Sequence, residues 1–148
     1  MNQRRSQPYR NVTLRDEALE DLREIAQRSR DIAIEVLRLL KLLDAGSLTP
    51  VRLNDHAKTG DLTDCGKIVV AVSGHPEHRI VVRDLGRGRF EVSEVIAIDA
   101  RAEDLAYLLA GLRLGRIVDP VRRSDASRRV DRIRRAARPS GPSDERRD

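Results

Sequence analysis

The apolar positions near the N-terminus recur with the period of an α-helix. In residues 16–28 they include Ala18, Leu22 and Ile25, and residues 31–45 repeat the same spacing of three or four positions. This spacing is typical of helices that bury one face. A short break around Ser29 separates the two segments, so we expect them to form a helical hairpin.

The pattern changes to alternation in the second half of the chain. Runs rich in Val and Ile at 67–73, 78–84 and 90–99 are separated by turn-forming residues, and a weaker alternation covers 9–14. These runs predict strands, and leucines at helical spacing predict a last helix over 101–114. The order β-α-α-β-β-β-α predicts an α+β fold, in which the helical hairpin and the C-terminal helix cover one face of a small, mostly antiparallel sheet.

Composition divides the chain into three parts. We expect a basic N-terminal arm at 1–9, one folded domain at 10–116 and an Arg-rich, disordered C-terminal tail at 117–148, with a basic helix at 126–137 as the alternative for part of the tail. The net charge of +5 belongs to the two ends, because residues 11–115 contain more carboxylates than cations. Bulk charge therefore does not predict nucleic-acid binding by the folded domain.

Hydropathy and cysteine content indicate the compartment. The first residues lack the apolar run of a signal peptide, and no segment approaches the length of a membrane span. The single cysteine excludes an internal disulfide, which suits a reducing environment. We expect a soluble, cytoplasmic protein that does not associate with membranes.

Cations occur at selected positions of the predicted strands and at the start of the last helix. Lys67 begins one strand, Arg79 and Arg83 share a face of the next, and Arg101 is followed six residues later by Tyr107. Arginine binds two phosphate oxygens at once, so this series indicates binding of phosphate or nucleic acid. The alternatives are that the cations form the solvated face of a sheet and that Tyr107 is a packing residue.

The histidines and the cysteine do not form a recognisable metal motif. His75 and His78 are close in the chain, but His56 and Cys65 do not provide a matching second pair. We therefore expect neither a metal nor an organic cofactor.

The ordered motifs resemble those of a known protein family. The motifs are Asp64-Cys65-x-Lys67-Ile68 entering a strand, His78-Arg79-Ile80-Val81-Val82-Arg83 in the next strand, and Arg101 with Tyr107 six residues later. With these motifs, residues 10–116 resemble the RelE/ParE superfamily of type II toxin-antitoxin toxins. The RelE-like branch consists of ribosome-dependent endoribonucleases that cleave mRNA, and the ParE-like branch inhibits DNA gyrase. In both branches a cognate antitoxin silences the toxin.

The resemblance to the RelE-like branch implies a role for each residue. The expected reaction is a metal-independent attack of the RNA 2′-hydroxyl on the adjacent phosphorus. Lys67 takes or shares the hydroxyl proton, Arg79 and Arg101 clamp the phosphate, and Tyr107 stacks on a base or steers the nucleophile. Arg83 is expected to contact the RNA backbone.

One position departs from the ribonuclease pattern. The pattern has a second lysine two residues after Lys67, and this chain has Val69 there. Loss of one stabilising charge costs on the order of 10²-fold in rate in comparable sites, unless Arg83 compensates. Two other functions therefore stay open, namely non-enzymatic inhibition of gyrase and a degenerate toxin that binds RNA or an antitoxin.

Overall fold

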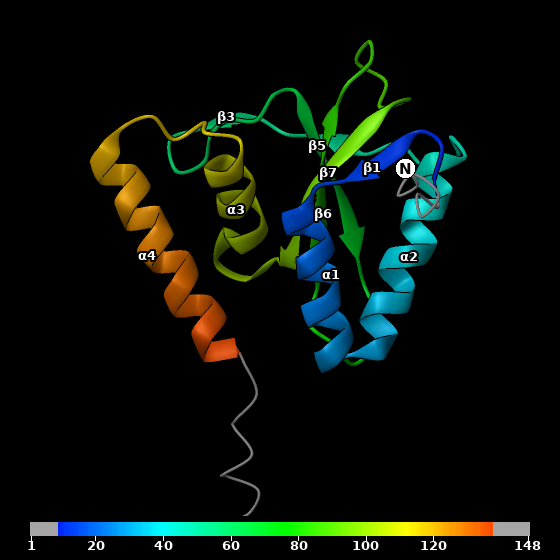
Figure 1. Cartoon of the computed structure of the whole chain (residues 1–148), viewed down its shortest axis with the longest axis horizontal. Helices are drawn as coiled ribbons and strands as arrows, with labels where there is room; N and C mark the ends of the chain where they lie inside the picture. The colour runs from blue at the N-terminus through cyan, green and yellow to red at the C-terminus, as the bar shows by residue number, and fades with distance from the viewer. Residues whose placement is uncertain (1–8, 138–148) are drawn as a thin grey trace, which may run out of the picture.

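The Val- and Ile-rich runs form the centre of a five-stranded sheet (Figure 1). The computed structural model describes residues 9–137. In it β5 (Cys65–Val70), β6 (His78–Asp84) and β7 (Ser93–Ala100) are antiparallel neighbours. Their side chains are buried on both faces of the sheet, which explains the apolar character of consecutive positions.

Two short strands complete the edges of this sheet. β1 (Val12–Leu14) runs parallel to β7, and β2 (Val51–Arg52) runs antiparallel to β5. The strand order is β1-β7-β6-β5-β2. The structure thus confirms the predicted α+β class and the mostly antiparallel sheet.

The helical hairpin forms as predicted. α1 (Asp16–Arg28) and α2 (Arg30–Asp44) are joined by Ser29, whose hydroxyl accepts a hydrogen bond from the backbone N–H of Ile32 at 3.3 Å. This bond caps the N-terminus of α2. The hairpin packs against one face of the sheet through an aliphatic core that includes Ile25, Leu40, Ile80 and Ile98.

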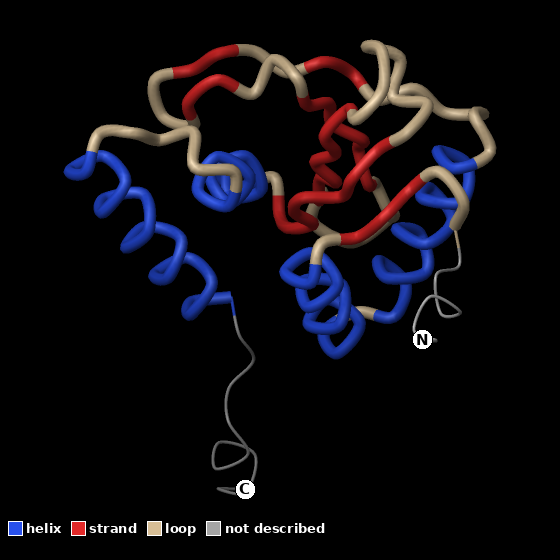
Figure 2. Tube along the Cα trace, turned by 45° about the horizontal axis from the view of Figure 1, so that its top comes forward, coloured by secondary structure: helices blue, strands red, loops and turns tan. Residues whose placement is uncertain are grey.

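The helices do not all cover the same face, which corrects the sequence-based expectation. α3 (Leu105–Arg113) lies against the opposite face of the sheet (Figure 2). The reason is visible in β6, where Ile80 and Val82 face the hairpin while Val81 lies in a second core with leucines of α3. A strand that is apolar on both sides needs a cover on both sides.

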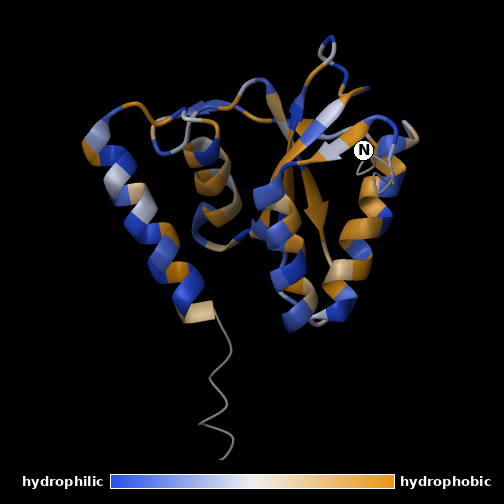
Figure 3. Ribbon diagram, in the orientation of Figure 1, coloured by the Kyte–Doolittle hydropathy of each residue, from blue (hydrophilic) through white to orange (hydrophobic). Residues whose placement is uncertain are grey.

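A fourth helix occupies much of the expected C-terminal tail. α4 (Pro120–Ala137) is hydrophilic over most of its length (Figure 3), but it buries Ala126 and Val130 against α3. At its start the Asp119 carboxylate accepts a hydrogen bond from the Val121 N–H at 2.9 Å. The disordered tail is therefore wrong for residues 120–137, because tertiary contacts stabilise a helix that would be marginal alone. Residues 1–8 and 138–148 lie outside the described residues.

A small hairpin forms between β2 and β5. β3 (Asp55–His56) and β4 (Gly60–Asp61) pair with each other and pack on α3. The approach is so close that a Cβ atom on Gly111 of α3 would collide with the Thr59 carbonyl. The hairpin therefore has a fixed place over α3, and its side chains become part of the surface described next.

The chain between β7 and α3 also differs from the expected helix start. A 3₁₀ turn, η2 (Ala102–Asp104), precedes α3, and Glu103 and Asp104 have left-handed φ values of 55° and 60°.

Within residues 9–137, no helix has the length and hydrophobicity needed to cross a membrane.

Candidate functional site

Lys67 and Arg79 point to the same face of the sheet, the face covered by α3. Each alternates along its strand with residues that face the helical hairpin, Ile68 on β5 and Ile80 on β6. Lys67 pairs with Val81 across the strands. Lys67 and Arg79 are therefore diagonal neighbours, about 7–8 Å apart between Cα atoms.

Arg79 is held by hydrogen bonds at the base of the site. Arg79 as a whole is only 6% exposed to solvent. Its Nε donates to the Tyr107 hydroxyl at 3.1 Å, and its Nη1 donates to Glu77 Oε1 at 3.0 Å and to the His78 carbonyl at 3.1 Å. These bonds fix the guanidinium plane, and α3 contributes Tyr107 from the other side.

Lys67 and Tyr107 line a common cavity of about 220 Å³. The β3–β4 hairpin supplies His56 and Lys58 to the same cavity, and the turn before α3 supplies Asp104. The cavity is therefore closed by elements far apart in the sequence, and it holds two lysines with one carboxylate.

Arg101 lies near Arg79 and does not line the cavity of Lys67 and Tyr107. Its side chain is 63% exposed, and together with Arg79 and Glu77 it lines a shallow depression. Arg101 Nε is 4.0 Å from Glu77 Oε1. Lys67 and Tyr107 thus line one cavity, Arg79 and Arg101 line another with Glu77, and the Arg79–Tyr107 hydrogen bond connects the two.

Arg83 shares this face, but its guanidinium is partly occupied by a carboxylate. Its Nε donates to Asp64 Oδ2 at 3.2 Å, and Arg116 binds both oxygens of the same carboxylate at 2.9 Å. Hydrogen bonding by Arg116 lowers the pKa of Asp64 to about 2. Arg83 therefore belongs to a separate group beside the site, in which two arginines share one carboxylate.

Val69 adds no positive charge to the site, and Cys65 adds no reactive nucleophile. Val69 is opposite Arg79 in the β5–β6 register and is 44% exposed, so an apolar side chain stands where a cation is expected in the ribonuclease pattern. Burial raises the pKa of the Cys65 thiol to about 12, which makes its thiolate inaccessible near neutral pH.

His56 is a proton-transfer candidate that the sequence analysis did not identify. Its Nδ1 accepts a hydrogen bond from the Lys58 backbone N–H at 3.1 Å, so the neutral ring carries its proton on Nε2. No local pattern indicated this role, because only the docking of the β3–β4 hairpin brings His56 beside Lys67 and Tyr107. In residues 9–137 no three His, Cys, Asp or Glu side chains cluster closely enough to hold a metal ion.

Comparison with known proteins returned no match among family models, curated proteins or solved structures. The residues and their geometry are therefore the basis for any functional assignment.

Proposed function

We propose that this chain is a RelE-like toxin that binds mRNA and cleaves it without a metal. The observation that carries the proposal is the hydrogen bond from Arg79 Nε to the Tyr107 hydroxyl, which connects the cavity of Lys67 with the depression of Arg101. A fixed guanidinium with two further cations nearby is suited to a phosphodiester that gains negative charge during reaction.

The contacts of Arg79 determine how it would bind phosphate. Among residues 9–137, its hydrogen bonds to protein groups involve Nε and Nη1. Nη2 is the nitrogen left for a phosphate oxygen, and Arg101, being exposed, can approach the same phosphate from solvent. Tyr107 lines the cavity next to Arg79, where a base can stack on its ring.

Proton transfer in the proposed reaction involves Lys67 and His56. Attack of the 2′-hydroxyl on phosphorus requires an acceptor for its proton and a donor for the leaving 5′-oxygen. Lys67 is assigned the first role by the resemblance. His56, in the same cavity, can donate a hydrogen bond from Nε2–H to the leaving 5′-oxygen, which then takes its proton from solvent.

Two features favour a second candidate function without cleavage. Val69 removes one expected cation, and Glu77 partly neutralises both Arg79 and Arg101. Either a ParE-like inhibitor of DNA gyrase or a toxin that has kept only RNA or antitoxin binding would retain the basic surface without needing a complete catalytic set.

The proposed cellular setting follows from the toxin assignment. The protein would act in the cytoplasm, its targets being mRNA and the ribosome, and a cognate antitoxin would cover the basic surface. In the gyrase alternative, DNA gyrase replaces mRNA and the ribosome as target.

A cleavage assay tests the proposal. Purified protein is incubated with a 5′-labelled mRNA, with and without ribosomes, in the presence of EDTA. We expect fragments ending in 2′,3′-cyclic phosphate, and a rate about 10²-fold lower for Lys67→Ala or Arg101→Ala. Lys41→Ala, an equal change in charge at an exposed position of α2, is the matched control.

Two results would contradict the proposal. One is cleavage that Lys67→Ala and Arg101→Ala leave unchanged. The other is the absence of cleavage together with inhibition of gyrase-driven supercoiling, which would favour the ParE-like function.

A further inference from the structure

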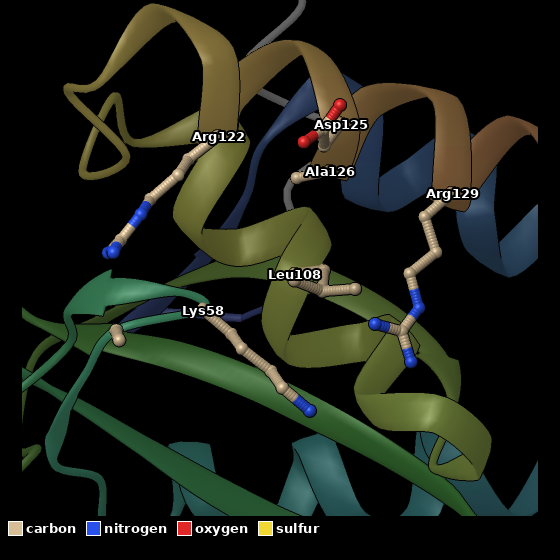
Figure 4. A pocket seen from close by; sticks show the side chains of 7 residues that line it. Lys58, Leu108, Arg122, Asp125, Ala126 and Arg129 are labelled. Carbon is tan, nitrogen blue, oxygen red and sulfur yellow. The ribbon is translucent and has the colours of Figure 1, made fainter.

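A second cavity lies between α3, α4 and the β3–β4 hairpin (Figure 4). None of the site residues that the resemblance identifies lines it. Its volume is about 330 Å³. The side chains around it come from these three elements: Ala57, Lys58, Leu108, Arg122, Asp125, Ala126 and Arg129.

The charges around this α3–α4 cavity are predominantly positive. Lys58, Arg122 and Arg129 face a single carboxylate, Asp125, which is itself paired with Arg128. Asp125 therefore contributes little negative charge to the cavity, and the charged groups around its largely apolar interior are mostly cations.

The cavity cations are weakly paired. Arg129 Nη2 is 3.8 Å from Glu103, and Lys58 Nζ is 3.9 Å from Asp104. Both distances are too long for a hydrogen bond, and both carboxylates belong to the exposed turn before α3. Exposed ion pairs of this kind exchange readily for a stronger anion.

Arg129 and Arg122 each have unused hydrogen-bonding capacity. Arg129 Nε is buried and has no acceptor among residues 9–137. Arg122 is exposed and forms no ion pair with any described residue. In Figure 4 the two guanidinium groups point away from each other, Arg122 and Arg129 lying on either side of Leu108, and Lys58 extends from the β3–β4 hairpin below them.

Lys58 connects the two cavities. It lines the cavity of Lys67 and Tyr107 as well as the α3–α4 cavity. A strand with one phosphodiester at Arg79 and Arg101 can therefore continue past Lys58 into the second cavity.

We propose that the α3–α4 cavity is a subsite for a backbone phosphate of single-stranded RNA. Arg129 binds the phosphate from one side of Leu108, the exposed Arg122 side chain turns toward it from the other side, and Lys58 bridges it to the cleavage site. The subsite rests on the proposed function for the identity of the strand, and it assigns a role to α4. An acidic segment of a protein partner is the competing occupant.

Binding of a fluorescein-labelled 12-nucleotide oligouridylate, followed by anisotropy at several salt concentrations, tests the subsite. The cavity variant is Arg122→Gln/Arg129→Gln. The control is Arg132→Gln/Arg135→Gln, which removes the same charge from exposed positions of α4 that do not line the cavity. We expect about tenfold weaker binding by the cavity variant only, and a salt slope smaller by about 0.7 for each RNA phosphate that the variant no longer neutralises.

Equal weakening by both double variants, or no weakening by either, would overturn the subsite. Displacement of the RNA by a hexaglutamate peptide at similar concentration, abolished in the cavity variant, would assign the cavity to an acidic protein segment instead. Arg122→Gln alone provides a second test if the double variant does not fold, because Arg122 forms no ion pair among the described residues.

Cleavage by the same proteins separates the two proposals. Wild-type protein that binds the oligonucleotide but does not cleave mRNA contradicts the proposed function, while the cavity variant still decides the subsite. Cleavage that depends on Lys67, combined with equal binding by the cavity and control variants, contradicts the subsite alone. Wild-type protein that does not bind the oligonucleotide contradicts both.

Discussion

The arginines around α3 fall into two groups that differ in how their charge is balanced. In the first group Arg113 and Arg134 bind Asp21, which is only 2% exposed and also accepts a hydrogen bond from the Ile98 N–H at 2.9 Å. In the second group, at the candidate site, Arg79 and Arg101 share the exposed carboxylate of Glu77.

The geometry of the first group explains its structural role. Arg113 donates from two nitrogens to the two oxygens of Asp21, at 2.6 and 2.9 Å, and Arg134 bridges Asp21 to Asp99. β1 pairs with β7 over Ser93–Val95 only. Farther along this edge of β7, the Asp21 carboxylate accepts the hydrogen bond from the Ile98 N–H. This Asp21 network ties α1, α3 and α4 to the sheet.

The difference between the groups shows which cations are available to a ligand. Cations that meet buried carboxylates in bidentate geometry are committed to the fold. At the candidate site, the cations outnumber the nearby carboxylates, and Arg101 is open to solvent. The contrast therefore indicates where a phosphate can bind without breaking the structure.

The largest effect should come from disrupting the Asp21 network. Asp21→Ala leaves Arg113 and Arg134 without their shared carboxylate and should lower the free energy of unfolding by about 3–5 kcal/mol. Urea denaturation measures the change. Asp31→Ala, at an exposed carboxylate of α2, is the control and should cost less than about 0.5 kcal/mol. A decrease below about 1 kcal/mol for Asp21→Ala would show that the network is not required for stability.

A smaller and opposite effect is expected at Glu77. Glu77→Gln removes the carboxylate shared by Arg79 and Arg101 but keeps an oxygen that can accept the Arg79 hydrogen bond. RNA binding should become about threefold to tenfold tighter at low salt, since this negative charge repels phosphate. Fluorescence anisotropy with a labelled oligonucleotide measures the gain.

The matched control for this gain is Glu17→Gln, an equal charge change at an exposed position of α1. An equal gain in both variants would mean that RNA responds to net charge rather than to this site. Unchanged affinity in Glu77→Gln would remove Arg79 and Arg101 from the RNA-binding surface.

The sequence predicted the regular parts of the molecule because their signals are local. The helical period of α1 and α2 and the alternation of β5 and β6 depend on neighbouring residues alone. β7 starts at Ser93 instead of near Phe90 because Phe90 has a left-handed φ of 57°, which breaks the strand despite the apolar side chain.

The parts that the sequence did not predict depend on contacts between distant segments. α4 is polar over most of its surface, and its stability relies on two buried residues and on Arg134, which reaches Asp21 across 113 positions. Likewise His56 and Lys58 become site residues only when the β3–β4 hairpin packs on Gly111. Residue patterns within one segment contain no information about such pairings.

The acid response of Asp64 tests an intermediate case between the two groups. Arg83 and Arg116 both bind Asp64, but its side chain is 38% exposed, so solvent screens the pairs. Its pKa of about 2 lies below the usual value of 3.8. The stabilisation is therefore complete above about pH 4 and disappears as the pH falls toward 2, because the unfolded chain takes up the proton first.

After allowance for screening, this decrease in stability should be below about 1 kcal/mol, the smallest of the three effects. Urea denaturation at pH 5, 3 and 2 should show a shallower acid slope for Asp64→Asn than for the wild type. RNA affinity in the neutral range should change little if Arg83 serves the fold, whereas a clear gain would mean that Asp64 had been withholding Arg83 from the RNA. Asp64→Asn thus decides to which of the two arginine groups Arg83 belongs.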